Sequence, residues 1–416
     1  MNKKVLLWTL LFLMAFMFIR CTAVDKEDNN GSNQPSPGQQ VPEPKPIEKD
    51  PIAETIKDMT IEEKLGQMLI VGIEGYEMDE GTEQMIEELH IGGFILFGRN
   101  ISNPEQLLDL NNSLKAANSI NKIPLFISVD EEGGRISRIP KVIKNLPTSK
   151  DIGKQNNEAF SYEIGMLLAE KVSAFGFNMD FAPVLDINSN PKNPIIGDRA
   201  FGSKAEVVRD LGVQTMMGIK SGGIVPVVKH FPGHGDTSVD SHVGLPSVEN
   251  DLERLKSFEL IPFKAAIDNG AECVMVAHIL LSKIDAENPA TLSKIIITDV
   301  LRNQLNFEGV VITDDMTMGA ITKNYDLAEA AVQSVNAGTD IILVAHKYEN
   351  ALGTMKSLKA AVETGKITGK RIDQSVYRIL KLKQKYKLQD SMTQSVDIIT
   401  INQRIESTLD KYMNNN

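Results

Sequence analysis

The sequence is poor in the residues that mark several large classes of protein. It has only two cysteines among 416 residues, Cys21 and Cys273, so a framework of several disulfides is excluded. Cys273 lies in an apolar run and is predicted to be a buried free thiol. The formal net charge is −11 and no long block of Lys or Arg occurs, which argues against nucleic-acid binding and against basic patches that attach to anionic lipid.

The N-terminus carries an apolar run over Val5–Ile19 that is too short for a spanning helix, which needs about 20 residues, and is typical of a signal peptide. Cys21 follows at the place of the acceptor cysteine of a bacterial lipoprotein, although Arg20 stands where such signals have a small residue. Residues 1–21 are therefore predicted to be a signal peptide or lipoprotein-like leader, with an uncleaved anchor as the alternative. A lipoprotein-like leader or an uncleaved anchor would tether the protein to the cell membrane, facing outward. A cleaved signal peptide would instead lead to secretion.

Composition divides the rest of the chain into three parts. Residues 22–50 are rich in Asn, Pro, Gln, Glu and Ser and have little to bury, so they are predicted to be a disordered linker. Residues 51–389 alternate between apolar and amphipathic segments and are predicted to form one large domain. Residues 390–416 form a C-terminal tail that is too short for a second domain.

Short apolar runs recur through the large domain and are typical of parallel strands that are buried on both faces. The runs are Met68–Ile73, Gly92–Phe97, Pro124–Val129, Phe177–Leu185, Ile224–Val228, Cys273–Ala277, Gly309–Ile312 and Asp340–Ala345. Helical patterns lie between them, over Glu83–His90, Pro104–Ala117, Ala159–Phe175, Lys204–Ser221, Leu252–Asn269, Lys294–Gln304, Leu327–Ala337 and Ala351–Thr364. Eight such units predict an α/β fold, a (β/α)8 barrel. An open doubly wound sheet is the alternative, but no Gly-x-Gly-x-x-Gly turn follows the first strand.

Ionisable residues stand at the ends of six consecutive predicted strands, where a barrel places its catalytic groups. They are Asp130, Asp186, Lys229 with His230, His278, Asp314 and His346. A charge at a buried strand end costs free energy unless it is paired or used, and six together are hard to explain by packing. This end of the barrel is therefore the predicted site.

The segment after the fifth strand, residues 229–250, is long for such a connection and holds three of the six histidines. A metal site is one interpretation, but the spacing matches no established zinc signature. A structural role is the second, and for His234 it weighs as much as a functional one. Proton transfer is the third, with Asp240 orienting the ring of His242 and stabilising its cation. Gly233 and Gly235 are expected to give the segment hinge freedom.

Four motifs carry a resemblance to a known family. They are Val129-Asp-Glu-Glu-Gly-Gly-Arg135 with Arg138, Gly197-Asp-Arg-Ala-Phe-Gly202, Lys229-His-Phe-Pro-Gly-His-Gly235 with Asp240-Ser-His242, and Ile312-Thr-Asp-Asp-Met-Thr-Met318. Together they resemble glycoside hydrolase family 3, specifically the bacterial β-N-acetylglucosaminidases of cell-wall recycling, over residues 54–388.

The resemblance implies a retaining β-N-acetylhexosaminidase that needs no cofactor or metal. It makes Asp314 the nucleophile and the pair Asp240 and His242 the acid/base. It also implies that the terminal sugar is bound by Asp130, Arg138, Arg199, Lys229 and His230. Asp186 is a further expected contact. The physical chemistry agrees, because a retaining mechanism needs a carboxylate and a proton donor on opposite faces of the anomeric carbon.

Other rim residues have structural interpretations. Asp315 is predicted to support its neighbour, and Arg135 to form an ion pair. The remaining members are predicted to be buried histidines, pocket-wall or core methionines, or rim charges without a role: His278, His346, Met316, Met318, Glu131 and Glu132.

The sole tryptophan is Trp8, in the leader, so the predicted domain lacks the broad aromatic platforms that long polysaccharide clefts need. A small polar pocket for one terminal N-acetylglucosamine, and hence an exo-acting enzyme, is the prediction. The enzyme is also expected to be a monomer. The alternatives are a β-glucosidase or β-xylosidase, a phosphorylase, a metal-dependent hydrolase, and a non-catalytic sugar-binding lipoprotein.

Overall fold

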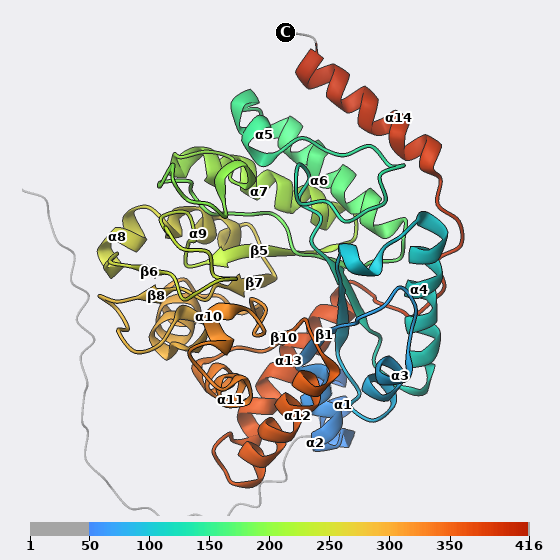
Figure 1. Ribbon diagram of the computed structural model, residues 1–416, viewed down its shortest axis with the longest axis vertical. Helices are drawn as coiled ribbons and strands as arrows, with labels where there is room; N and C mark the ends of the chain where they lie inside the picture. Colours follow the sequence, from blue (N-terminus) through green and yellow to red (C-terminus); the bar gives the residue numbers. More distant parts are fainter. Residues whose placement is uncertain (1–49, 415–416) are drawn as a thin grey trace, which may run out of the picture. The chain divides into compact units, whose positions relative to one another are not determined.

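The computed structural model describes residues 50–414 of the chain (Figure 1). The predicted leader at 1–21 and the predicted linker at 22–50, apart from Asp50, lie outside the described residues. Asp50 is the N-cap of the first helix, where its side chain accepts hydrogen bonds from the backbone of Ile52 and Ala53. Among the residues that are described, no helix has the length and apolar character needed to cross a bilayer.

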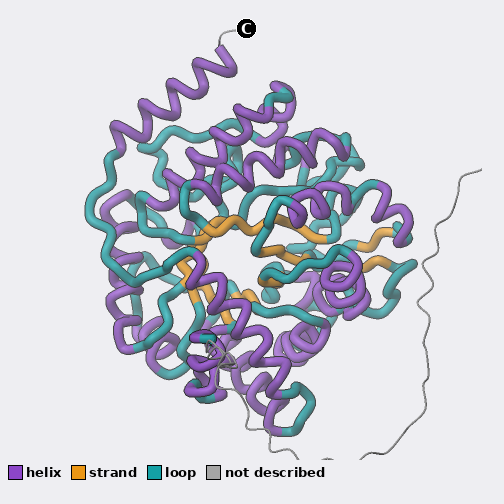
Figure 2. Tube along the Cα trace, turned by 180° about the vertical axis from the view of Figure 1, so that it is seen from behind, coloured by secondary structure: helices purple, strands orange, loops and turns teal. Residues whose placement is uncertain are grey.

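Eight parallel strands form the centre of the domain, and the helices surround them (Figure 2). The strands are β1 (Leu69–Gly72), β2 (Gly93–Leu96), β3 (Phe126–Val129), β4 (Met179–Asp180), β5 (Val225–Phe231), β7 (Cys273–Val276), β9 (Val310–Thr313) and β10 (Ile342–Val344). The order is β10-β1-β2-β3-β4-β5-β7-β9, and a bridge between Ile312 and Ile341 joins the two ends of this sheet. The predicted (β/α)8 barrel is confirmed.

The helices pack their apolar faces on the strands. Their bounds are α1 (Pro51–Asp58), α2 (Ile61–Gln67), α3 (Glu80–Glu87), α4 (Pro104–Ala117), α5 (Ser149–Gln155), α6 (Glu158–Ser173), α7 (Ala205–Ser221), α8 (Leu252–Ser257), α9 (Leu260–Asp268), a π-helix (Ile295–Gln304), α10 (Gly319–Thr322), α11 (Leu327–Ala337), α12 (Tyr348–Glu363), α13 (Gly369–Lys385) and α14 (Ile398–Leu409). Thr60 and Glu63 form a capping box at the start of α2, where the backbone donors of a helix end otherwise lack partners. A separate pair, β6 (Ser247–Val248) and β8 (Leu280–Leu281), lies outside the barrel.

Proline explains two departures from the predicted elements. The fourth strand was predicted over Phe177–Leu185 but is only two residues long, because Pro183 has no N–H for the ladder and the chain rejoins β5 only at Val184. The helix predicted over Leu252–Asn269 is split into α8 and α9. Pro262, in the first turn of α9, cannot donate the hydrogen bond that would continue α8 into it.

A network of buried charges lies below the strands, at their N-terminal ends. The Asp340 carboxylate, which is fully buried, accepts hydrogen bonds from Ser375 at 2.6 Å and from Arg378 at 3.2 Å, and it also pairs with Arg302 and Arg371. Burial alone would raise the pKa of Asp340, but the three guanidinium charges outweigh it and hold the pKa below the usual value.

Lys383 of α13 completes the base of the barrel. Its ammonium donates to Gln67 Oε1 at 2.8 Å, to the Gly92 carbonyl at 2.9 Å and to the Pro124 carbonyl at 2.6 Å. These three acceptors match the three donors of an ammonium group. Lys383 therefore ties α13 to the starts of the first three strands.

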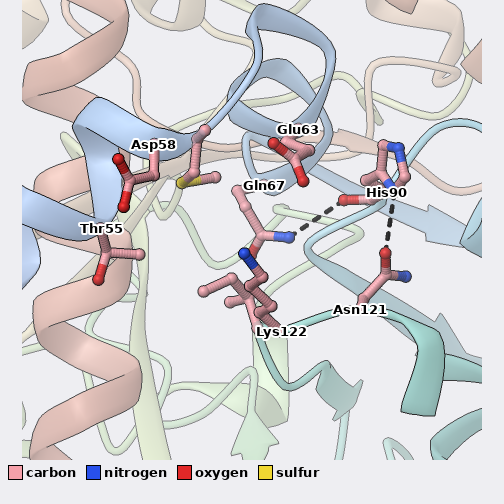
Figure 3. Close-up of a pocket in the computed structure, with 9 residues that line it drawn as sticks. Thr55, Asp58, Glu63, Gln67, His90, Asn121 and Lys122 are labelled. Atoms are coloured by element: carbon pink, nitrogen blue, oxygen red, sulfur yellow. Dashed lines mark hydrogen bonds between the residues drawn. The ribbon is translucent and has the colours of Figure 1, made fainter.

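A small pocket of about 150 Å³ opens beside this base (Figure 3). Part of its polar lining is paired within the protein, because Gln67 donates to the His90 carbonyl at 3.1 Å and the His90 ring bonds with Asn121 at 2.9 Å. None of the predicted site residues lies here.

The predicted C-terminal tail contains helix α14, which lies beside α6 (Figure 1). Ile401 and Ile405 are buried in the main apolar core. Asn402 accepts a hydrogen bond from the backbone N–H of Lys144 at 2.7 Å. The tail thus covers part of the barrel without forming a domain of its own.

Candidate active site

A pocket of about 450 Å³ opens at the C-terminal ends of the strands. All eight predicted site residues line it: Asp130, Arg138, Arg199, Lys229, His230, Asp240, His242 and Asp314. The backbone explains this convergence, because the carboxyl ends of parallel strands in a barrel meet at one face. Apolar side chains, including Ile95, Met275 and Leu343, complete the wall.

One side of the pocket is a chain of alternating charges. Lys229 Nζ lies 2.6 Å from both Asp130 Oδ1 and Glu132 Oε1, and Arg199 makes two hydrogen bonds to Glu132 at 2.7 and 2.8 Å. Burial alone would raise the pKa of Glu132, but Arg199 and Lys229 outweigh it and hold the pKa far below the usual range. Glu132, Arg199 and Lys229 are therefore held in their charged forms before any ligand arrives.

Glu132 had been predicted to be a rim charge without a role, and that prediction is wrong. Its side chain is buried and bridges the two cations on which sugar binding was predicted to depend. Its neighbour Glu131 is also buried, and accepts hydrogen bonds from Lys171 at 2.6 Å and from the Arg138 backbone at 2.7 Å. Both glutamates hold the predicted ligand groups in place.

Asp186 lies behind the pocket wall rather than in it. It is fully buried and accepts a hydrogen bond from His230 Nδ1 at 2.6 Å and from the backbone N–H of His234 at 2.6 Å. Asp186 therefore does not line the pocket, and its carboxylate instead orients the His230 ring, whose Nε2 lies 3.4 Å from Arg199.

Arg138 differs from the other cations of the pocket. Its Nε is buried and has no hydrogen-bond partner within residues 50–414. A buried donor without a partner costs free energy, so the Arg138 guanidinium is less fully paired than Lys229 and Arg199.

Asp314 directly follows β9, and its backbone N–H donates to the Val276 carbonyl at 2.9 Å. Burial would raise the pKa of Asp314, but the nearby rings of His278 and His230 outweigh it and lower the pKa, with a smaller contribution from His242. The carboxylate is therefore ionised at neutral pH, as a nucleophile must be.

The neighbours of Asp314 have structural partners. Asp315 accepts hydrogen bonds from the backbone of Thr317 at 2.9 Å and of Ala345 at 3.0 Å, as expected of a supporting residue. His278 is fully buried and bonds with Thr291 and with the Asp315 carbonyl. His346, by contrast, is half exposed at the pocket, where it stacks on Phe97.

The loop between β5 and β6, residues 232–246, has two unlike halves. In the first half, residues 232–237, His234 is buried and its ring bonds with Thr237 at 2.9 Å. Burial lowers the pKa of His234 to about 4, so it is neutral and structural. Gly235 is no hinge, because a Cβ there would lie 1.7 Å from the Ile187 carbonyl oxygen; the glycine permits close backbone packing.

The second half of the loop, residues 238–244, is more exposed and carries Asp240 and His242. Asp240 Oδ1 accepts hydrogen bonds from both the backbone N–H and the ring Nδ1 of His242, each at 2.8 Å. This pairing assigns the proton to Nδ1 in the neutral ring and leaves Nε2 free for transfer. The His242 side chain is 65% exposed, so a ligand can reach it.

The metal interpretation finds little support in the part of the chain that the structure describes. No group of three or more His, Cys, Asp or Glu side chains there is arranged to hold a metal ion. The histidines of the β5–β6 segment bond instead with Asp186, Thr237 and Asp240.

A polar pocket at this end of a barrel, with a carboxylate at one strand end and a carboxylate–imidazole pair on a loop, is an arrangement that a retaining glycoside hydrolase requires. Comparison with known proteins gives the family. Residues 60–382 match the Glycosyl hydrolase family 3 N terminal domain, and the chain belongs to this family. The family predicted from the four motifs is confirmed.

The similar proteins have related names. Beta-hexosaminidase A of Pseudoalteromonas piscicida is 34% identical over 73% of this chain, which spans only 54% of that protein. Beta-hexosaminidase of Methylobacillus flagellatus is 34% identical over 70% of this chain and 84% of its own length. The structure of a family 3 β-N-acetylglucosaminidase from Paenibacillus sp. FPU-7 is 40% identical with a TM-score of 0.80, and covers 85% of this chain and 69% of that one.

Proposed function

We propose that the protein is a retaining, exo-acting β-N-acetylglucosaminidase that hydrolyses terminal non-reducing N-acetyl-β-glucosamine. The observation that carries the proposal is that one pocket is lined both by the ionised Asp314 and by a His242 ring that Asp240 holds by Nδ1. The names of the relatives support the choice of an acetamido sugar.

The reaction takes place in two steps. Asp314 attacks the anomeric carbon as the glycosidic bond breaks, and His242 Nε2 gives its proton to the leaving oxygen. The sugar is then bonded to Asp314 through an ester. In the second step His242 takes a proton from water, whose oxygen displaces Asp314 and restores the carboxylate. Asp240 stabilises the imidazolium that the first step requires.

The charged side of the pocket binds the sugar hydroxyls in this proposal. Lys229 and Arg199 donate hydrogen bonds, Asp130 accepts them, and His230 Nε2 and Arg138 complete the set. Because Glu132 already fixes the two paired cations, little side-chain entropy is lost when the sugar binds. A small pocket of this kind favours one terminal residue over the interior of a polymer.

The test compares release of nitrophenol from the N-acetyl-β-glucosaminide and the β-glucoside, with EDTA present, by the wild type and by Asp314→Ala. Fast release from the acetamido sugar, lost in the variant, is the expected result. Preference for the glucoside would overturn the sugar specificity. No release from either would favour a binding protein, and activity that EDTA abolishes would restore the metal interpretation.

In this proposal the natural substrates are muropeptides or related cell-wall fragments. The enzyme is a monomer, and its N-terminal leader tethers it outside the cytoplasm. The leader sequence supports the tether. The resemblance of the four motifs to cell-wall recycling enzymes supports the choice of substrate. Cell fractionation of the wild type and of Cys21→Ala tests the tether: the wild type is expected with the membranes. Recovery of the wild type in the soluble cytoplasm would contradict it, and gel filtration tests the monomer.

A further inference from the structure

The segment that carries His242 rests against helix α10, which follows the strand of Asp314. The backbone N–H of Ala320 donates to the Ser241 carbonyl at 2.9 Å, and Lys323 Nζ donates to the Val243 carbonyl at 2.6 Å. The carbonyls on both sides of His242 are therefore bound by one turn of helix.

Gly319 lets the segment approach this closely. A Cβ at position 319 would lie 2.5 Å from the carbonyl oxygen of His242 and 3.3 Å from the carbonyl carbon of Val243. Both neighbours are backbone atoms, which cannot rotate aside as a side chain does. Any residue larger than glycine at this position must push the segment away from α10.

The other contacts of the second half of the loop are weaker, although Ser241 is itself buried. The side chains of Val239 and Val243 are 43% and 62% exposed, so they bury little apolar area. A bond between Ser241 Oγ and His234 Nε2, at 3.3 Å, is long. The contacts with α10 are thus the main link between His242 and the barrel.

Helix α10 is itself fixed relative to Asp314. Between the two lie Met316, which is fully buried and whose N–H donates to the Leu343 carbonyl at 2.9 Å, and Met318, which is 7% exposed. The chain from Asp314 to α10 therefore has little freedom. Whatever binds the segment to α10 also sets the position of His242 relative to Asp314.

We propose that Gly319 and Lys323 are positioning residues for proton transfer, which hold His242 at the pocket through the backbone on either side of it. Neither residue touches the substrate. The proposal rests on the proposed function, because it assigns a purpose to the place of the acid/base.

The test uses the chemistry of the leaving group. A 2,4-dinitrophenyl aglycone departs without a proton, whereas the second sugar of N,N′-diacetylchitobiose needs one from His242. A change that misplaces only His242 lowers kcat/KM for the disaccharide and spares the dinitrophenyl substrate. A change that disturbs Asp314 or sugar binding lowers both.

For Gly319→Ala we expect kcat/KM for the disaccharide to fall by about 10- to 100-fold, and for the dinitrophenyl substrate by less than about 3-fold, because only acid catalysis is impaired. Lys323→Met should show the same pattern at about 2- to 5-fold, since one exposed hydrogen bond is lost. Lys323→Arg keeps a donor and should restore most of the rate. Lys366→Met, which removes an exposed ion pair with Glu329, is the matched control and should behave as wild type.

A double-mutant cycle sharpens the assignment. In a His242→Ala background, Lys323→Met should have no further effect on the disaccharide, because the group that it positions is gone. A further loss there, or an equal loss on both substrates for Gly319→Ala, would overturn the proposal. A wild type that releases neither aglycone would instead refute the proposed function, so the two failures are distinguishable.

Discussion

At the base of the barrel and at its opposite end, buried charges are used in different ways. The base network is closed: Asp340 has three guanidinium partners, and Lys383, whose pKa burial lowers to about 7, has one acceptor for each donor of its ammonium form. The site network is left open, because Arg138 Nε has no partner in the described chain and His242 is exposed. Buried charge by itself therefore does not mark a functional site.

The largest effect on activity is expected at the active site, whose charge network is open. Asp314→Ala should lower kcat by on the order of 10⁴-fold or more, because no other carboxylate takes the place of the nucleophile. The free energy of unfolding should change by no more than about 1 kcal/mol, which is within the usual range for one substitution. Steady-state kinetics and urea unfolding of the same preparation check both. Residual activity above a hundredth of wild type would mean that another group attacks.

His242→Ala should cost about 10²- to 10⁴-fold in kcat/KM for a disaccharide, the usual contribution of general acid catalysis. Its stability should stay within about 0.5 kcal/mol of wild type, because the side chain is largely exposed. A series of aryl aglycones of increasing acidity measures the effect, which should shrink along the series. A constant loss across the series would argue against proton donation by this residue.

At the base of the barrel, Asp340→Asn should destabilise the fold by about 3–5 kcal/mol, because it leaves three buried or half-buried guanidinium groups without a counter-charge. Activity per folded molecule should be unchanged. Asp373→Asn, which breaks the more exposed pair with Lys64, is the control and should cost at most about 1 kcal/mol. Urea unfolding compares them, and an equal loss in the two variants would remove the distinction between closed and exposed pairs.

The stability difference between wild type and Asp340→Asn should depend on pH. The folded pKa of Asp340 lies below its ordinary value of 3.8, so its ionised form stabilises the protein above that value. This contribution is lost as the pH falls through the folded pKa. The stability gap between wild type and Asp340→Asn should therefore be full at neutral pH and narrow at pH values below about 4. A gap that stays constant down to acid unfolding would contradict the assignment.

The smallest effect distinguishes two cations of one pocket. Arg138→Met should raise KM by about 10- to 100-fold, the equivalent of a charged hydrogen bond, without loss of stability. Arg199→Met should impair both binding and stability, because Glu132 then loses one of its two partners. Kinetics and thermal unfolding of the two variants give the comparison. Equal destabilisation would show that Arg138 also belongs to a closed network.

The barrel was predictable from the sequence because strands buried on both faces leave continuous apolar runs, and these runs can be counted. The predicted fourth strand and the predicted helix over residues 252–269 were too long. Pro183 and Pro262 lack the N–H that would continue these elements, although the apolar pattern runs on past both prolines. The helix in the tail also had a signal. Ile401 and Ile405 are four residues apart and lie on one helical face.

The site was predictable as a set of residues but not as a network. Nothing in Asp130-Glu-Glu indicates that Glu132 faces two cations while Glu131 pairs with Lys171, because the partners lie far away in the sequence. The same holds for the contact between Gly319 and His242, which joins the helix after β9 to the loop after β5. Motifs identify the chemistry of single side chains, whereas pairings across the barrel depend on its closure.

The buried thiol of Cys273 on β7 can report how often the barrel opens. Burial raises the pKa of the thiol, and only the thiolate reacts readily with alkylating reagents, so labelling must wait until the barrel opens. In a Cys21→Ser chain this is the sole sulfhydryl group. Its labelling rate then reports how often the centre of the sheet is exposed to solvent, with no dye, tag or denaturant added to the protein.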